Sequence, residues 1–143
     1  MSGEVPWYRL IDHTGDIAML VRAATLPALY GAAARALFDV ILDVRTVEPR
    51  ERLDVGVDGA VDAEDLLVRF LSELLFLHDS RGWLFRGAEI LELGSDRLRA
   101  SAIGEPFDPA RHAIQREVKA VTYHHLLLSE DAEGWSARLV LDL

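Results

Sequence analysis

Two carboxylates and an imidazole interrupt an apolar segment near the start of the chain, in the stretch Asp12-His13-Thr14-Gly15-Asp16. In an unbroken strand the two aspartates would lie about 13 Å apart on one face. Gly15 permits the positive φ of a tight turn, which would fold the chain back and bring the carboxylates together. Carboxylates held close together repel unless a cation lies between them, and hard divalent cations prefer oxygen ligands. The stretch is therefore either part of a cation site or a polar hairpin turn whose aspartates cap backbone N–H groups.

Lys119 lies in a strand-like segment, EVKAVTYHHL, whose two faces are mostly apolar near its start. A lysine there is either a functional cation or an edge-strand charge that discourages aggregation. His124 and His125 would point to opposite faces of a regular strand, so they are not expected to bind one ion together. Each is interpreted as a structural or surface histidine. Glu105, in the polar segment GEPFDPARH, is a further possible ligand, although turn and capping roles also account for it.

Asp142 lies one residue from the end of the chain, in the strand-like run LVLDL. If this run forms a hairpin with the Lys119 segment in which Leu128 faces Trp135, then Asp142 faces Val121. Lys119 would then be the diagonal neighbour of Asp142 on the same face, about 7–8 Å away. A slip of one residue would place the two side chains on opposite faces.

The elements that position these residues follow from hydrophobic periodicity and turn signals. Strands are expected at residues 7–12, 17–24, 53–57, 83–93, 97–103, 118–128 and 135–143. One helix is expected from residue 26 to about residue 42, with Thr25 as its N-cap, and a second after the N-cap Asp62. This order predicts a single α+β domain over residues 1–143, with two amphipathic helices packed on one face of a largely antiparallel sheet.

Composition limits the class of protein. Half of the residues are apolar and 27% are charged, which is typical of a soluble globular domain, and the absence of cysteine excludes thiolate metal sites. The net charge is −9 and the arginines are scattered along the sequence, so direct nucleic-acid binding is not expected. No signal peptide or membrane-spanning run is apparent, and a cytoplasmic location without membrane association is expected.

Four stretches occur in the order and at the spacings of one known family: DHTGDI at 12–17, GEPFD at 104–108, EVKAVTYH at 117–124 and LVLDL at 139–143. On these stretches the chain resembles the archease family over essentially its full length. The family usually has alanine at the position of Gly15. That departure is mild, because it should loosen the turn without removing a ligand.

The resemblance implies a non-catalytic accessory protein of the RtcB-type RNA ligase, which acts in tRNA splicing and RNA repair. Archeases promote the metal-dependent guanylylation of a ligase histidine and allow multiple turnovers. The resemblance assigns the functional cluster to Asp16, Lys119 and Asp142, with a divalent cation (Ca, Mg or Mn) held by the acidic residues. Asp12 and His13 lie beside the cluster and are further candidate metal ligands.

Two other functions stay open. A stand-alone metal-dependent phosphoester hydrolase would hold its ion with Asp12, His13 and Asp16 and would turn over without a partner. A chaperone-like docking module for RNA-modifying proteins would use the acidic surface alone, and its binding would survive a chelator. The sequence favours the accessory function, because a hydrolase would normally show more ligands and a recognisable base.

Overall fold

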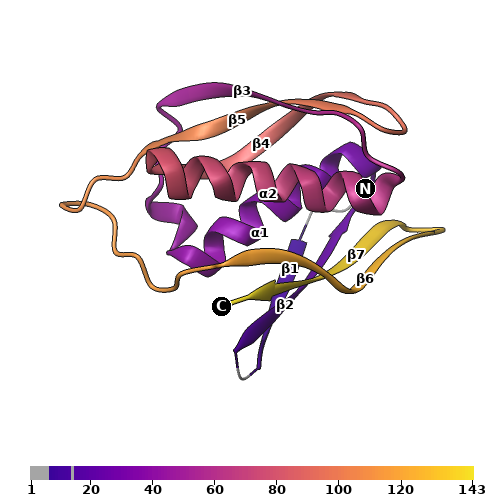
Figure 1. The fold of residues 1–143 in the computed structure, drawn as a ribbon, viewed down its shortest axis with the longest axis horizontal. Helices are drawn as coiled ribbons and strands as arrows, with labels where there is room; N and C mark the ends of the chain where they lie inside the picture. Colours follow the sequence, from indigo (N-terminus) through magenta and orange to yellow (C-terminus); the bar gives the residue numbers. More distant parts are fainter. Residues whose placement is uncertain (1–6, 14) are drawn as a thin grey trace.

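Two antiparallel sheets enclose two helices in the computed structural model of the protein. The structure describes residues 7–13 and 15–143, with all of their side chains except that of His13. Sheet A has the strand order β1-β2-β7-β6 and sheet B the order β3-β5-β4 (Figure 1). The strands of sheet A are β1 (Trp7–His13), β2 (Asp16–Ala23), β7 (Gly134–Asp142) and β6 (Ala120–Asp131). Those of sheet B are β3 (Glu51–Val57), β5 (Leu98–Pro106) and β4 (Trp83–Leu93). The helices are α1 (Leu26–Ile41) and α2 (Ala63–Arg81), and a short 3-10 turn, η1 (Val44–Thr46), follows α1.

The predicted α+β fold with two helices packed on antiparallel strands is confirmed, but the strands divide into two sheets rather than one. The reason lies in α1, which contacts strands of both sheets. Its buried side chains cover more than half of the helix circumference: Leu29, Tyr30, Ala33, Ala34, Ala36, Leu37, Phe38, Val40 and Ile41. A helix that is buried over so wide an arc must be covered from more than one direction. A single sheet would leave one of its faces in water.

The helices begin where the sequence predicts. The Thr25 hydroxyl accepts the N–H of Ala28 at 3.2 Å, and the Asp62 carboxylate accepts the N–H of Asp65 at 2.7 Å. At the other end of α2, Gly82 adopts a left-handed conformation (φ 72°) that ends the helix. Within the residues that the structure describes, neither helix is long and apolar enough to cross a bilayer.

The strands of sheet A alternate between a buried and an outward-facing side. In β2, Ile17, Met19 and Val21 are buried in the core shared with the helices. The even-numbered positions of β2 and of β7 therefore face away from the helices. This surface is termed the outer face of sheet A, and it is formed by residues 16, 18, 20 and 22, residues 136, 138, 140 and 142, and the residues paired with them.

The pairing of the final hairpin differs from the prediction in two places. Leu128 pairs with Ala137 rather than with Trp135, and the register shifts again between Thr122 and Leu127. His125 lies in this irregular stretch with a positive φ of 54°. The extra residues bulge out of β6, and Asp142 consequently faces Ala120 instead of the predicted Val121.

Gly104 offers a test of the sheet B packing. It pairs with Glu51 on one side and Phe85 on the other, and a Cβ at this position would overlap the carbonyl oxygen of Leu84. Gly104→Ala is therefore expected to lower the free energy of unfolding by about 2 kcal/mol or more, measured by urea denaturation. The control is Gly87→Ala, since a Cβ there meets nothing within 4 Å. Equal destabilisation by both substitutions would contradict this packing.

Candidate functional site

A tight turn closes the hairpin of β1 and β2. His13 pairs with Asp16, so only residues 14 and 15 separate the paired positions. Gly15 has a φ of 80°, a conformation that glycine adopts without a steric penalty. The predicted role of Gly15 in folding the chain back is confirmed.

Three distant segments meet at this end of sheet A. Asp16 pairs with Asp142 on the neighbouring strand, and the backbone N–H of Lys119 donates to the Asp142 carbonyl at 2.8 Å. The backbone N–H of Leu143 donates to the Gly15 carbonyl at 3.1 Å, which holds the C-terminus beside the β1–β2 turn (Figure 1). The backbone thus brings the first hairpin, the Lys119 segment and the end of the chain together.

Asp16 and Asp142 form a pair of like charges on the outer face of sheet A. Directly opposed residues in antiparallel strands have Cβ atoms about 5 Å apart, and like charges placed there repel. Asp16 is half-buried and Asp142 is exposed. Among the described residues, no hydrogen bond or ion pair engages either carboxylate. Their oxygen atoms are therefore available as ligands for a cation, whose charge would remove the repulsion.

Lys119 is placed differently from the prediction. Its main chain bonds to Asp142, but Ala120 is the residue directly opposite that aspartate. A continuing strand would therefore direct Lys119 to the opposite face from Asp142, the result of the one-residue slip considered above. Lys119 is exposed, and its ammonium forms no ion pair with a described carboxylate. The backbone of Lys119 is thus close to the two aspartates, while its ammonium is not paired with any described carboxylate.

Asp12 does not converge with Asp16, contrary to the expectation from the turn. Asp12 pairs with Ile17, which is buried on the helix side of sheet A, so Asp12 and Asp16 lie on opposite faces of the hairpin. The Asp12 carboxylate instead accepts the Arg116 guanidinium at 3.0 Å. Asp12 therefore anchors the segment that leads to Lys119.

The histidines differ in how close they lie to the two aspartates. The register places His13 opposite Asp16, but its side chain lies outside what the structure describes. His124 and His125 lie in the irregular part of β6 with ring centroids 4.0 Å apart, so the expected alternation is wrong there. They are several residues from the Asp142 pairing. Among the described residues, no group of three or more side chains of the metal-binding types gathers anywhere.

Glu105 is a structural residue. It is buried in β5, where its carboxylate binds the Arg111 guanidinium and accepts the backbone N–H of Glu48 at 2.8 Å. It also lies 2.9 Å from Nε2 of buried His112. The His112 Nδ1 accepts the Asp108 N–H at 2.9 Å, so Nε2 carries the proton and donates to Glu105. The bonds of Glu105, that to Arg111 foremost, lower its pKa to about 2.

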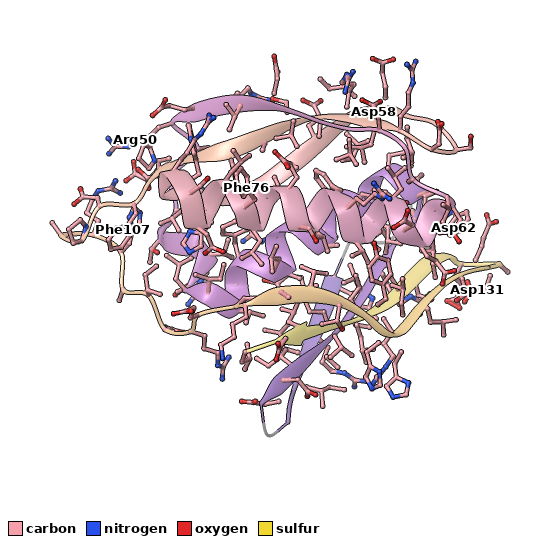
Figure 2. The ribbon with its side chains drawn as sticks, viewed as in Figure 1. Arg50, Asp58, Asp62, Phe76, Phe107 and Asp131 are labelled. Atoms are coloured by element: carbon pink, nitrogen blue, oxygen red, sulfur yellow. The ribbon has the colours of Figure 1, made fainter. Side chains whose placement is uncertain are left out.

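This network fixes segment 107–119, which ends at Lys119 beside Asp142. Figure 2 shows Phe107 and Arg50 at the same end of the molecule, and Arg50 also approaches Glu105, at 3.4 Å. Further along, the backbone N–H groups of Gln115 and Arg116 both donate to the carbonyl of Ile41 at the end of α1. The predicted possibility that Glu105 is a metal ligand is not favoured, since arginine, histidine and backbone donors already occupy its oxygens.

Sequence reasoning missed the two arginines that organise this segment. Arg111 binds Glu105, and Arg116 binds Asp12 across 104 residues of sequence. The only local signal was the Asp108-Pro109 turn, which places Arg111 three residues after Asp108. Pairing with Asp12 carries no local signal, because it depends on how the segment packs against α1.

Comparisons with known proteins agree on one family. The model of the archease protein family matches residues 8–143. A protein archease of Methanopyrus kandleri is 42% identical over 97% of this chain and 100% of its own length. One of Pyrococcus furiosus is 42% identical over 92% of this chain and 95% of its own. The solution structure of Methanobacterium thermoautotrophicum protein 1598 matches with a TM-score of 0.77 and 30% identity, covering 95% of this chain and 98% of that one.

Glu105→Gln tests the buried network. We expect the free energy of unfolding at pH 7 to fall by about 3 kcal/mol, because Arg111 loses its buried counter-charge. The folded pKa of Glu105 is about 2 against an ordinary value of 4.5, so its stabilisation is present above pH 4.5 and is lost as the pH falls toward 2. The difference between the two proteins, measured by urea denaturation, should therefore narrow over that range.

The control for this test is Glu89→Gln. Glu89 pairs with Arg52 at the surface, where 59% of its side chain is exposed. Its substitution should change the free energy of unfolding by less than about 1 kcal/mol. A constant gap between Glu105→Gln and the unsubstituted protein across the acidic range would contradict the role given to the Glu105 charge.

Proposed function

Since the chain belongs to the archease family, we propose that it is a non-catalytic accessory protein of an RtcB-type RNA ligase. In this proposal it promotes the metal-dependent guanylylation of the ligase histidine and supports multiple turnovers in tRNA splicing and RNA repair. It acts in the cytoplasm, where the ligase is its protein partner. The single observation that carries the proposal is the direct pairing of Asp16 with Asp142 at the junction with the Lys119 segment.

The chemistry of the donor set fits a divalent cation of the Ca, Mg or Mn type. Asp16 and Asp142 offer hard oxygen ligands from two adjacent strands, and neither carboxylate is bonded to a described side chain. Two carboxylates supply part of a coordination shell, and water or a phosphate oxygen would complete it. When bound, such a cation supplies positive charge to the phosphate oxygens of a nucleoside triphosphate.

The charge of the chain supports docking on a basic partner. A net charge of −9 would steer an acidic end of the molecule toward a positively charged active-site mouth. Lys119 is exposed and forms no ion pair with a described carboxylate, so its ammonium is available to bind a phosphate oxygen of the ligase substrate. The proposed division of labour is that Asp16 and Asp142 hold the cation while Lys119 contacts phosphate.

The hydrolase alternative loses one of its three ligands. It required Asp12, His13 and Asp16 around one ion, but Asp12 faces the opposite side of the hairpin and binds Arg116. The docking-module alternative differs from the proposal in its metal dependence. If the partner ligase still binds and responds fully to this protein in the presence of a chelator, the docking module is the better account.

Asp16→Asn and Asp142→Asn each remove one charge with little change of shape. Stimulation of ligase guanylylation, measured as transfer of labelled GMP to the ligase, should fall about tenfold or more with either substitution. The matched control is Asp54→Asn, since Asp54 is an exposed aspartate on β3 in the other sheet. Undiminished stimulation by Asp16→Asn protein would refute the proposed site.

Thermal melting separates cation binding from activation. Ca²⁺ or Mg²⁺ at about 100 times its dissociation constant should stabilise the protein by about 2.7 kcal/mol, and Asp142→Asn should abolish this shift. Without cation, Asp142→Asn should melt no lower than the unsubstituted protein, because it removes one of two opposed like charges. Lys119→Gln should keep the cation shift but lose stimulation. Loss of the shift in Lys119→Gln would instead assign Lys119 to holding the carboxylates.

A further inference from the structure

Three arginines that are far apart in the sequence meet on the outer face of sheet A. The strand register aligns the outward residues in rows that run across all four strands. One row consists of Arg9, Leu20, Arg138 and Leu127. The next row consists of Trp7, Arg22, Ser136 and Ser129. Folding therefore gathers three of the scattered arginines on one face.

Arg9 and Arg138 flank Leu20 from the two neighbouring strands. The two arginines are two strands apart, so their Cβ atoms are about 10 Å apart, and their long side chains can reach toward one area of the outer face. Neither forms an ion pair within the part of the chain that the structure describes. Two cations so placed repel each other in the free protein. A polyanion laid across them would remove that repulsion, although the chain as a whole carries a charge of −9.

An aromatic ring adjoins these arginines. Trp7 is 41% exposed, and the Arg22 guanidinium lies 6.0 Å from the centre of its ring. A hollow of about 280 Å³ separates this pair from Leu127 and Arg138. Its volume suits one planar ring system better than a whole drug-sized ligand. An exposed indole beside guanidiniums on the surface of a sheet is the arrangement that stacks unpaired bases and binds their phosphates.

We propose that the outer face of sheet A binds a single strand of nucleic acid, with Arg9 and Arg138 on phosphate oxygens and Trp7 stacked on a base. The Ser129 and Ser136 hydroxyls, 3.2 Å apart in the Trp7 row, add donors and acceptors beside the stacked base. An extended strand fits this face better than a duplex, because base stacking on Trp7 requires an unpaired base. This binding goes beyond the ligase partnership and requires no other protein.

Fluorescence anisotropy of labelled oligo-uridylate and oligothymidylate of about ten nucleotides tests the proposal with the full chain at low salt. Saturable binding of either probe is expected, with tighter binding of the RNA if its 2′-hydroxyls are read. Arg9→Gln combined with Arg138→Gln should weaken binding about tenfold or more, and should flatten the dependence of log affinity on log salt by about 1.4. Trp7→Ala should weaken binding about fivefold or more while leaving that salt dependence unchanged.

The control pair is Arg81→Gln with Arg97→Gln. It produces the same change in net charge, at two exposed arginines on α2 and on the β4–β5 turn. Binding should survive in this pair, and Arg9→Gln alone serves if the double variant of the outer face fails to fold. Three results would overturn the proposal: no saturable binding, equal loss in the control pair, or equally tight binding of poly-glutamate with no effect of Trp7→Ala. The last would assign the face to an acidic protein segment.

Discussion

The antiparallel pairing of β2 with β7 joins the first hairpin to the last strand, and both proposed binding surfaces depend on its register. Asp16 meets Asp142 at one end of this pairing, and Leu20 meets Arg138 four residues away. The backbone bond from Leu143 to Gly15 holds the register at the very end of the chain. A slip of one residue would turn Asp142 and Arg138 toward the helices and expose core leucines instead. Burial of Ile17, Met19 and Leu139 therefore enforces the placement of the polar residues on the outer face.

Glu105 and the Asp16–Asp142 pair represent two physically different uses of acidic residues. Glu105 is buried, and four donors from Arg111, His112 and the Glu48 backbone satisfy its carboxylate. Removing it from water is tolerated only because those bonds replace the lost hydration. Asp16 and Asp142 are accessible, lie opposite one another and lack described partners. The bonds of Glu105 stabilise one conformation of segment 107–119. The carboxylates of Asp16 and Asp142 remain accessible to a ligand from outside the chain.

Local features were predictable from the sequence, and the arrangement of the elements relative to each other was less so. Thr25 and Asp62 act as N-caps as predicted, because capping depends on a few adjacent residues. The division into two sheets was missed, although the wide apolar arc of α1 was a usable signal. The proximity of Asp16 and Asp142 was inferred through the family resemblance. The hairpin register was wrong because the turn lies one residue later than predicted and because the bulge in β6 leaves no period-two signature.

The Asp16–Asp142 pair and the arginine rows lie on one face, and their spacing links the two proposals. Residues 16 and 20 of β2 are about 13 Å apart along the strand. A nucleic-acid strand that runs parallel to β2 from the Trp7 row would therefore bring phosphates close to Asp16 and Asp142. Those carboxylates repel phosphate unless a cation neutralises them. Binding of the nucleic acid in that direction and binding of the cation must then strengthen each other by the same factor. A nucleic acid that instead crosses the sheet along the arginine row leaves the two binding events independent.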